Sequence, residues 1–157
     1  MSALRHCLHL VGRFARQLDR RPPTPDEAAW AETHLSSTER ALWVRLGNGD
    51  RRHAIGVARR FSGARPDATR AELAGALLHD IGKVEGPEGA LRRAWMTVTP
   101  RPGETTRRYR DHERIGAELC ERAGSDPVTI ALVRGDAPAE VMRLLTDADS
   151  AGGLKRV

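Results

Sequence analysis

The chain of 157 residues is long enough for one domain with a single core, and 39% hydrophobic with 30% charged residues is typical of a globular protein. The formal net charge of +5 would suit a nucleic-acid partner, but only Lys83 and Lys155 among the 26 basic residues are lysines. That skew is typical of high-GC coding bias, so we expect no specific DNA binding. No apolar run reaches the length of a membrane span, and charged residues interrupt the short apolar run at the N-terminus. The sequence therefore favours a cytoplasmic protein, in which Cys7 and Cys120 are expected to be free thiols.

The first half of the chain carries clear helix signals. Apolar residues at helical spacing predict a helix over 4–18. Capping boxes at 24–27, 36–39 and 69–72 predict three helix starts. Trp30 and Trp43 are predicted to anchor these helices in the core. Gly47 and Gly49 are expected to end the second of the capped helices, and the next helix is predicted over 52–61.

The second half is predicted to be helical as well. A helix over 73–81 is expected to stop at Gly82 through a positive φ. A turn over 85–89, a short amphipathic helix over 91–98 and a loop over 100–106 follow. Helices are then predicted over 111–123, 127–133 and 138–149. With no internal repeat and no alternating strand pattern, we predict an all-α helical bundle: an N-terminal helical extension over 1–48, a core domain over 49–150 and a tail over 151–157.

The stretch His79-Asp80-Ile81-Gly82-Lys83 offers an imidazole beside a carboxylate, followed by a cation. Neutral imidazole and carboxylate together suit a divalent ion of the first transition row. A buried helix whose polar end reads His-Asp by accident is an equally good interpretation of this stretch alone.

Three other stretches supply candidate ligands: His53, His112, and the pair Asp147 and Asp149. His53 lies at the edge of an apolar stripe, where a histidine is more often structural than a ligand. At about 100° per residue, Asp149 falls nearer the apolar face of its helix than Asp147 does, so we expect Asp149 to face inward.

These motifs, in this order, resemble the HD-domain superfamily of metal-dependent phosphohydrolases, whose pattern is a His, a His-Asp pair and a final Asp on separate helices. His79 follows His53 by 26 residues and Asp149 follows Asp80 by 69, and the resemblance covers roughly 50–150. It implies an HD-domain helical bundle with His53, His79, Asp80 and Asp149 as metal ligands. The stretch 112–119 also looks like the helix that carries an additional metal histidine in many members. The chain is similar to small HD-domain proteins of high-GC bacteria, which commonly share an N-terminal extension.

The resemblance implies hydrolysis of a nucleotide or small phosphate ester by a metal-activated water, with Mn, Co, Ni, Fe, Zn or Mg as the cofactor. Asp80, Lys83 and His112 are then the expected catalytic residues. Lys83 would also contact the substrate phosphate, together with Arg107, Arg108 and Arg110, although a solvated helix start explains the arginines equally well.

Two departures from the family pattern keep other functions open. Dinuclear members usually carry a further histidine on the next helix, but 132–136 reads Leu-Val-Arg-Gly-Asp. We therefore expect one tightly bound ion, which counts against an HD-type di-iron oxygenase. Lys83 stands where the nucleotidase branch tends to have Glu, and it resembles the branch that includes cyclic-nucleotide phosphodiesterases. A non-catalytic nucleotide- or metal-binding sensor module is the third possibility.

Overall fold

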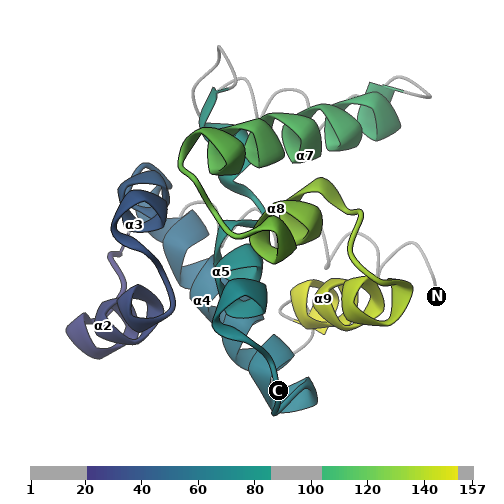
Figure 1. Cartoon of the computed structure of the whole chain (residues 1–157). Helices are drawn as coiled ribbons and strands as arrows, with labels where there is room; N and C mark the ends of the chain where they lie inside the picture. The colour runs from purple at the N-terminus through teal and green to yellow at the C-terminus, as the bar shows by residue number, and fades with distance from the viewer. Residues whose placement is uncertain (1–20, 86–103, 152–157) are drawn as a thin grey trace, which may run out of the picture.

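The computed structural model describes residues 21–85 and 104–151, which form seven α-helices and one short 3-10 helix (Figure 1). No strand occurs among these residues, so the fold is all-α as predicted. The predictions for 4–18, for 91–98 and for most of the turn over 85–89 lie outside the described residues. The elements are α2 Pro25–Thr33, α3 Ser37–Trp43, α4 Asn48–Ala64, α5 Arg70–Leu78, η1 Ile81–Glu85, α7 Glu104–Arg122, α8 Pro127–Arg134 and α9 Ala139–Ala151.

All three predicted capping boxes are confirmed. In each, the hydroxyl of the N-cap residue accepts the backbone N–H three residues later, and the glutamate there accepts the N–H of the N-cap residue. Two of the glutamates also pair with an arginine, since Arg70 contacts Glu39 at 3.5 Å and Arg65 contacts Glu72 at 3.0 Å. These local bonds explain why the starts of α2, α3 and α5 could be predicted from sequence.

Several predicted boundaries are wrong. Helix α4 begins at Asn48 rather than 52, because Gly47 is its N-cap and Gly49 lies inside its first turn. Helix α5 ends at Leu78 rather than 81, and the chain continues as the 3-10 helix η1. Helix α7 begins at Glu104, so 104–106 is helical instead of loop.

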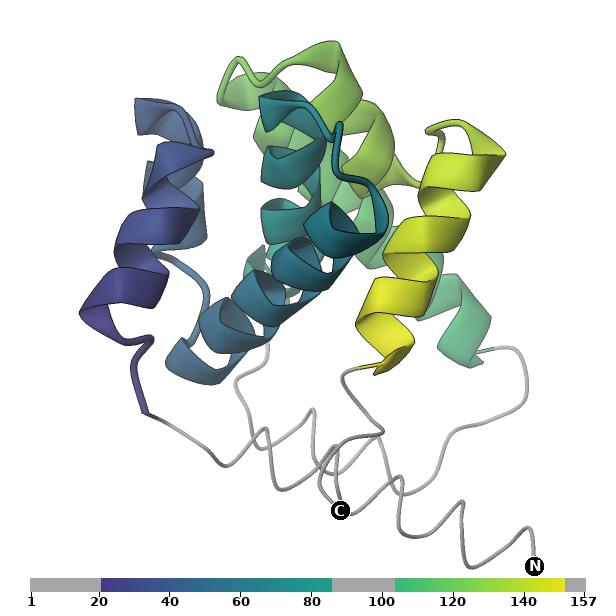
Figure 2. The same ribbon diagram turned by 90° about the horizontal axis from the view of Figure 1, so that it is seen from below.

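Helices α4 and α5 lie at the centre of the bundle, with α2 and α3 on one side and α9 on the other (Figures 1 and 2). Every residue of α5 from Leu73 to Leu78 is buried. Helix α8 packs closely on it, because a Cβ at Gly75 would lie 2.7 Å from the Cβ of Leu132. Trp43, 1% exposed, is a core anchor as predicted, whereas Trp30 is only partly buried.

Helices α2 and α3 and the turn between them contribute to the same hydrophobic cluster as the other helices, through Ala31, Leu35, Leu42 and Trp43. The described part of the N-terminal segment therefore shares one core with the rest of the bundle. Among the described residues, none of the helices combines the length and the hydropathy of a membrane span.

Cys120 of α7 is fully buried, and burial together with the nearby Glu39 carboxylate raises the pKa of its thiol to about 12. In a Cys7→Ser variant, we expect no reaction of the native protein with an aromatic disulfide reagent at pH 8. One thiol per chain should react after denaturation. Rapid reaction of the native variant would show that α7 opens far more readily than its packing suggests.

Candidate metal centre

The imidazole of His79 is held in one orientation by the end of α5. His79 is the C-cap of that helix, and its Nδ1 lies 2.9 Å from the carbonyl oxygen of Ala76. Because a carbonyl only accepts, Nδ1 carries the proton of the neutral ring, and Nε2 presents a lone pair.

That lone pair has no hydrogen-bond partner among the described residues, although Nε2 is buried. It lies 3.5 Å from Oδ2 of Asp80, so two acceptors face each other. This arrangement is costly unless a proton or a cation lies between them. A backbone carbonyl that accepts the N–H of one ring nitrogen, and so leaves the other nitrogen to bind an ion, is typical of a metal-ligating histidine.

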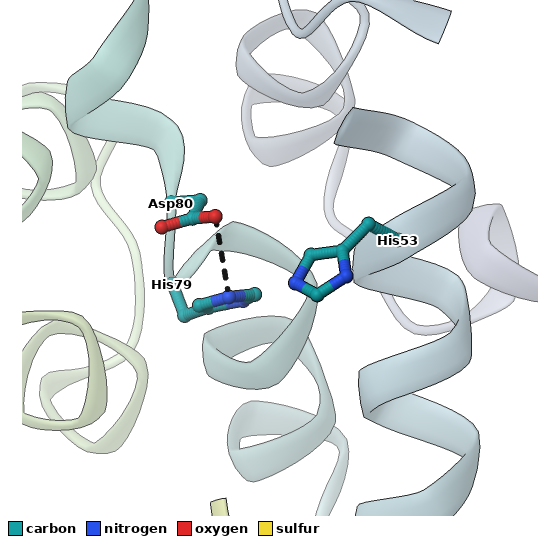
Figure 3. A group of neighbouring side chains, drawn as sticks. All are labelled: His53, His79 and Asp80. Carbon is teal, nitrogen blue, oxygen red and sulfur yellow. Dashed lines mark ion pairs between the residues drawn. The ribbon is translucent and has the colours of Figure 1, made fainter. Parts of the chain in front are cut away.

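His53 of α4 completes a group of three. Its ring extends from α4 toward His79 and Asp80, which follow α5 (Figure 3). One ligand atom from each of the three residues lies within 4.8 Å of the others, and all three side chains are partly buried. Two helices that are separate in sequence therefore bring two imidazoles and a carboxylate to one point.

Asp149 joins this group through His53. In the last turn of α9, its Oδ1 lies 2.8 Å from Nε2 of His53. The hydrogen bond from His53 lowers the pKa of Asp149, so the carboxyl group is ionised near neutral pH. Asp147, two residues earlier, is exposed.

Asp80 is the most enclosed acid of the site, with 13% of its side chain exposed. Burial alone would raise its pKa, but the neighbouring side chains of His79, Lys83 and His53, including the hydrogen bond from Lys83, hold the pKa of Asp80 well below its usual range. The Nζ atom of Lys83 lies 2.5 Å from Oδ2, and Nε2 of His112 lies 4.0 Å from Oδ1. Lys83 is therefore paired with the carboxylate instead of extending freely from the helix end.

A backbone contact between η1 and α7 brings His112 to Asp80. A Cβ on Gly82 would lie 1.9 Å from the carbonyl oxygen of His112 and 2.8 Å from the nitrogen of Gly116. The prediction that Gly82 stops a helix through positive φ is wrong, because the positive-φ glycines among the described residues are Gly124 and Gly135. Gly82 is instead required because any side chain would collide with α7.

Arg107, Arg108 and Arg110 lie in the first half of α7, and their side chains fall outside the described part of the structure. Arg108 precedes His112 by four residues, which is about one helical turn. Their predicted contact with phosphate stays a prediction.

The family model of the HD domain matches residues 51–149, nearly two thirds of the chain. The protein belongs to the HD-domain family. The matched segment contains His53, the His79-Asp80 pair, His112 and Asp149. Comparison with curated proteins and with solved structures gave no match.

HD domains form a superfamily of metal-dependent hydrolases and bind divalent metals, and the donor set of this HD domain fits such an ion. The buried Nε2 of His79 lacks a hydrogen-bond partner among the described residues, and an ionised carboxylate lies beside it. Two neutral imidazoles and the carboxylates of Asp80 and Asp149 carry a net charge of about −2, which a divalent cation would neutralise. Mixed nitrogen and oxygen donors suit a first-row transition ion better than Mg²⁺, which prefers oxygen alone.

Proposed function

We propose that this HD domain is a metal-dependent phosphohydrolase that acts on a nucleotide or a small phosphate ester. The observation that carries the proposal is the partly buried donor group of His53, His79 and Asp80, extended by Asp149 at 2.8 Å from His53. These four residues would hold one divalent ion, as Mn, Co, Ni, Fe or Zn and less favourably Mg. The bound ion would supply a Lewis acid that lowers the pKa of water toward neutrality and screens the charge of the phosphate.

The residues around this group have the chemistry to handle a phosphate. The side chain of Lys83 is 39% exposed, so it can meet a substrate from solvent while it contacts Asp80. An ammonium group has three donors, so Lys83 can keep its bond to Asp80 and still donate to a phosphate oxygen. It would then stabilise charge that develops on the phosphate or the leaving group.

His112 lies on the other side of Asp80, and 17% of its side chain is exposed. Its imidazole could donate a proton to a leaving oxygen, or it could contact the substrate by a hydrogen bond. A second phosphate would be bound by Arg108, which lies one helical turn before His112, together with Arg107 and Arg110. Bidentate guanidinium contacts would then favour a nucleotide with more than one phosphate.

A screen for phosphate release tests this proposal. The protein would be loaded separately with Mn, Co, Ni, Fe, Zn and Mg and given linear nucleotides, cyclic nucleotides and simple phosphate monoesters. We expect release with at least one metal and its loss on chelation. Tight nucleotide binding without phosphate release under any metal would favour a sensor module instead. Oxygen consumption by the iron-loaded protein would favour an oxygenase.

Replacing Lys83 with alanine should lower turnover by roughly 100-fold, the usual effect of losing one charged donor to a reacting oxygen. The metal should stay bound, because removing a cation beside Asp80 does not weaken the attraction of that carboxylate for another cation. Turnover and metal content would be measured on the same sample. Arg114→Ala, which removes an exposed partner of Glu118 on α7, is the matched control and should change neither. Loss of metal in Lys83→Ala would mean that Lys83 acts by holding Asp80 in place.

A further inference from the structure

Asp149 lies at a part of its helix that needs support from outside. Helix α9 ends at Ala151, and the last four carbonyl groups of a helix have no partner within it. The carbonyl of Ala148, next to Asp149, is one of these four. It accepts a hydrogen bond of 2.6 Å from Nε of Arg60, which belongs to α4.

Arg60 is also well placed relative to His53. It follows His53 on α4 by seven residues, about two turns, so both residues lie on nearly the same face. A Cβ at Gly56 would lie 3.2 Å from Nη1 of Arg60, so the guanidinium group lies back along α4 toward the turn that carries His53. Helix α4 thus holds the end of α9 at two neighbouring points, His53 to Asp149 and Arg60 to Ala148.

We infer that Arg60 is a positioning residue that caps the last turn of α9 and fixes Asp149 against His53. A cation at the carbonyl end of a helix is favoured by the helix dipole, and it supplies the donor that the helix itself lacks. Without it, the final turn opens more readily, because helix ends are the least stable parts of a helix. The expected effect of Arg60 on metal affinity rests on the proposed function, whereas its expected effect on the stability of the last turn of α9 does not.

Hydrogen exchange of the metal-free protein tests the capping step. In Arg60→Ala, the amides of the last turn of α9 should exchange about tenfold faster, because a hydrogen bond from a charged donor contributes a factor of this order. Arg60→Lys keeps a charged donor and should restore part of the protection. Arg59→Ala is the matched control, since the exposed Arg59 lies over Trp30 at 5.1 Å and should leave α9 unchanged. Equal protection in the wild type and Arg60→Ala would overturn the inference.

Titration with Co²⁺ tests the consequence for the site. We expect the dissociation constant to rise about tenfold in Arg60→Ala, with a changed visible spectrum of the bound Co²⁺, and both to recover partly in Arg60→Lys. A lower melting temperature with an unchanged spectrum and affinity would reduce Arg60 to a purely structural role and overturn the inference. If these metal effects appear but no substrate releases phosphate, the proposed reaction is wrong and the role of Arg60 stands. If the wild type binds no metal, the proposed function fails, and hydrogen exchange decides whether Arg60 positions Asp149.

Discussion

Asp80→Ala is expected to abolish metal-dependent phosphate release, with a loss of well over 100-fold. Asp80 is buried and ionised, and it lies between His79, Lys83 and His112. Its removal takes away one of four proposed ligands and one of two negative charges. Even residues that merely support metal ligands contribute 10- to 100-fold, so the loss of a ligand should exceed that range. Phosphate release would be measured with the best metal of the substrate screen, over a range of metal concentrations.

The fold should survive this substitution. Lys83 loses its bond to Asp80, but 39% of its side chain is exposed, so the ammonium group can be solvated. Asp80→Asn is the companion variant: it keeps the shape of the side chain but removes the charge, and it should be nearly as inactive. Asp147→Ala, an exposed substitution on α9, should keep full activity. If Asp80→Ala kept phosphate release at wild-type metal concentrations, the proposed site would be wrong.

Gly82→Ala is expected to lower the free energy of unfolding by about 3 kcal/mol and to weaken metal binding. The added Cβ would lie 1.9 Å from the carbonyl oxygen of His112. The obstacle is backbone, which cannot rotate away as a side chain would, so η1 and α7 must separate. Because this contact sets the distance between Asp80 and His112, both residues should shift with it. Urea unfolding and metal titration on the same variant measure the two effects.

Gly63→Ala is the matched control for Gly82→Ala. Gly63 lies inside α4, and a Cβ there meets nothing within 4 Å. Gly63 is the second-last residue of α4, and alanine within a helix is favoured over glycine by at most roughly 0.5–1 kcal/mol, so this variant should be no less stable than the wild type and bind metal normally. Similar changes in stability for the two variants would refute the steric explanation of Gly82.

The features that could be predicted from the sequence depend on local geometry. A capping box closes within four residues, so the starts of α2, α3 and α5 follow from adjacent side chains. The inward position of Asp149 follows from the register of one helix, and its bond to His53 agrees with that register. The imidazoles and carboxylates of the motifs could likewise be singled out by residue type and order.

The features that were missed depend on contacts between elements that are distant in sequence. Gly82 looked like a helix stop because its own neighbours are helical, but its role is set by His112 and Gly116 of α7. The only signal in the sequence was that the His79-Asp80 stretch and the His112 stretch each contain a glycine. Such a signal does not reveal that the backbones of these two stretches touch. Arg60 carried no signal at all, since its partner is a carbonyl group 88 residues away.

The metal-to-protein ratio of Asp149→Ala compared with Asp147→Ala tests the proposed metal centre most directly. These variants remove the same side chain two residues apart on α9, one at 2.8 Å from His53 and the other exposed. After loading with a transition metal and removal of the excess, we predict a ratio near one in the wild type and in Asp147→Ala, and near zero in Asp149→Ala. A ratio that stays near one in Asp149→Ala and falls in Asp147→Ala would contradict the ligand set. A wild-type ratio near two without a phosphate ligand, falling toward one in His112→Ala, would contradict the single ion.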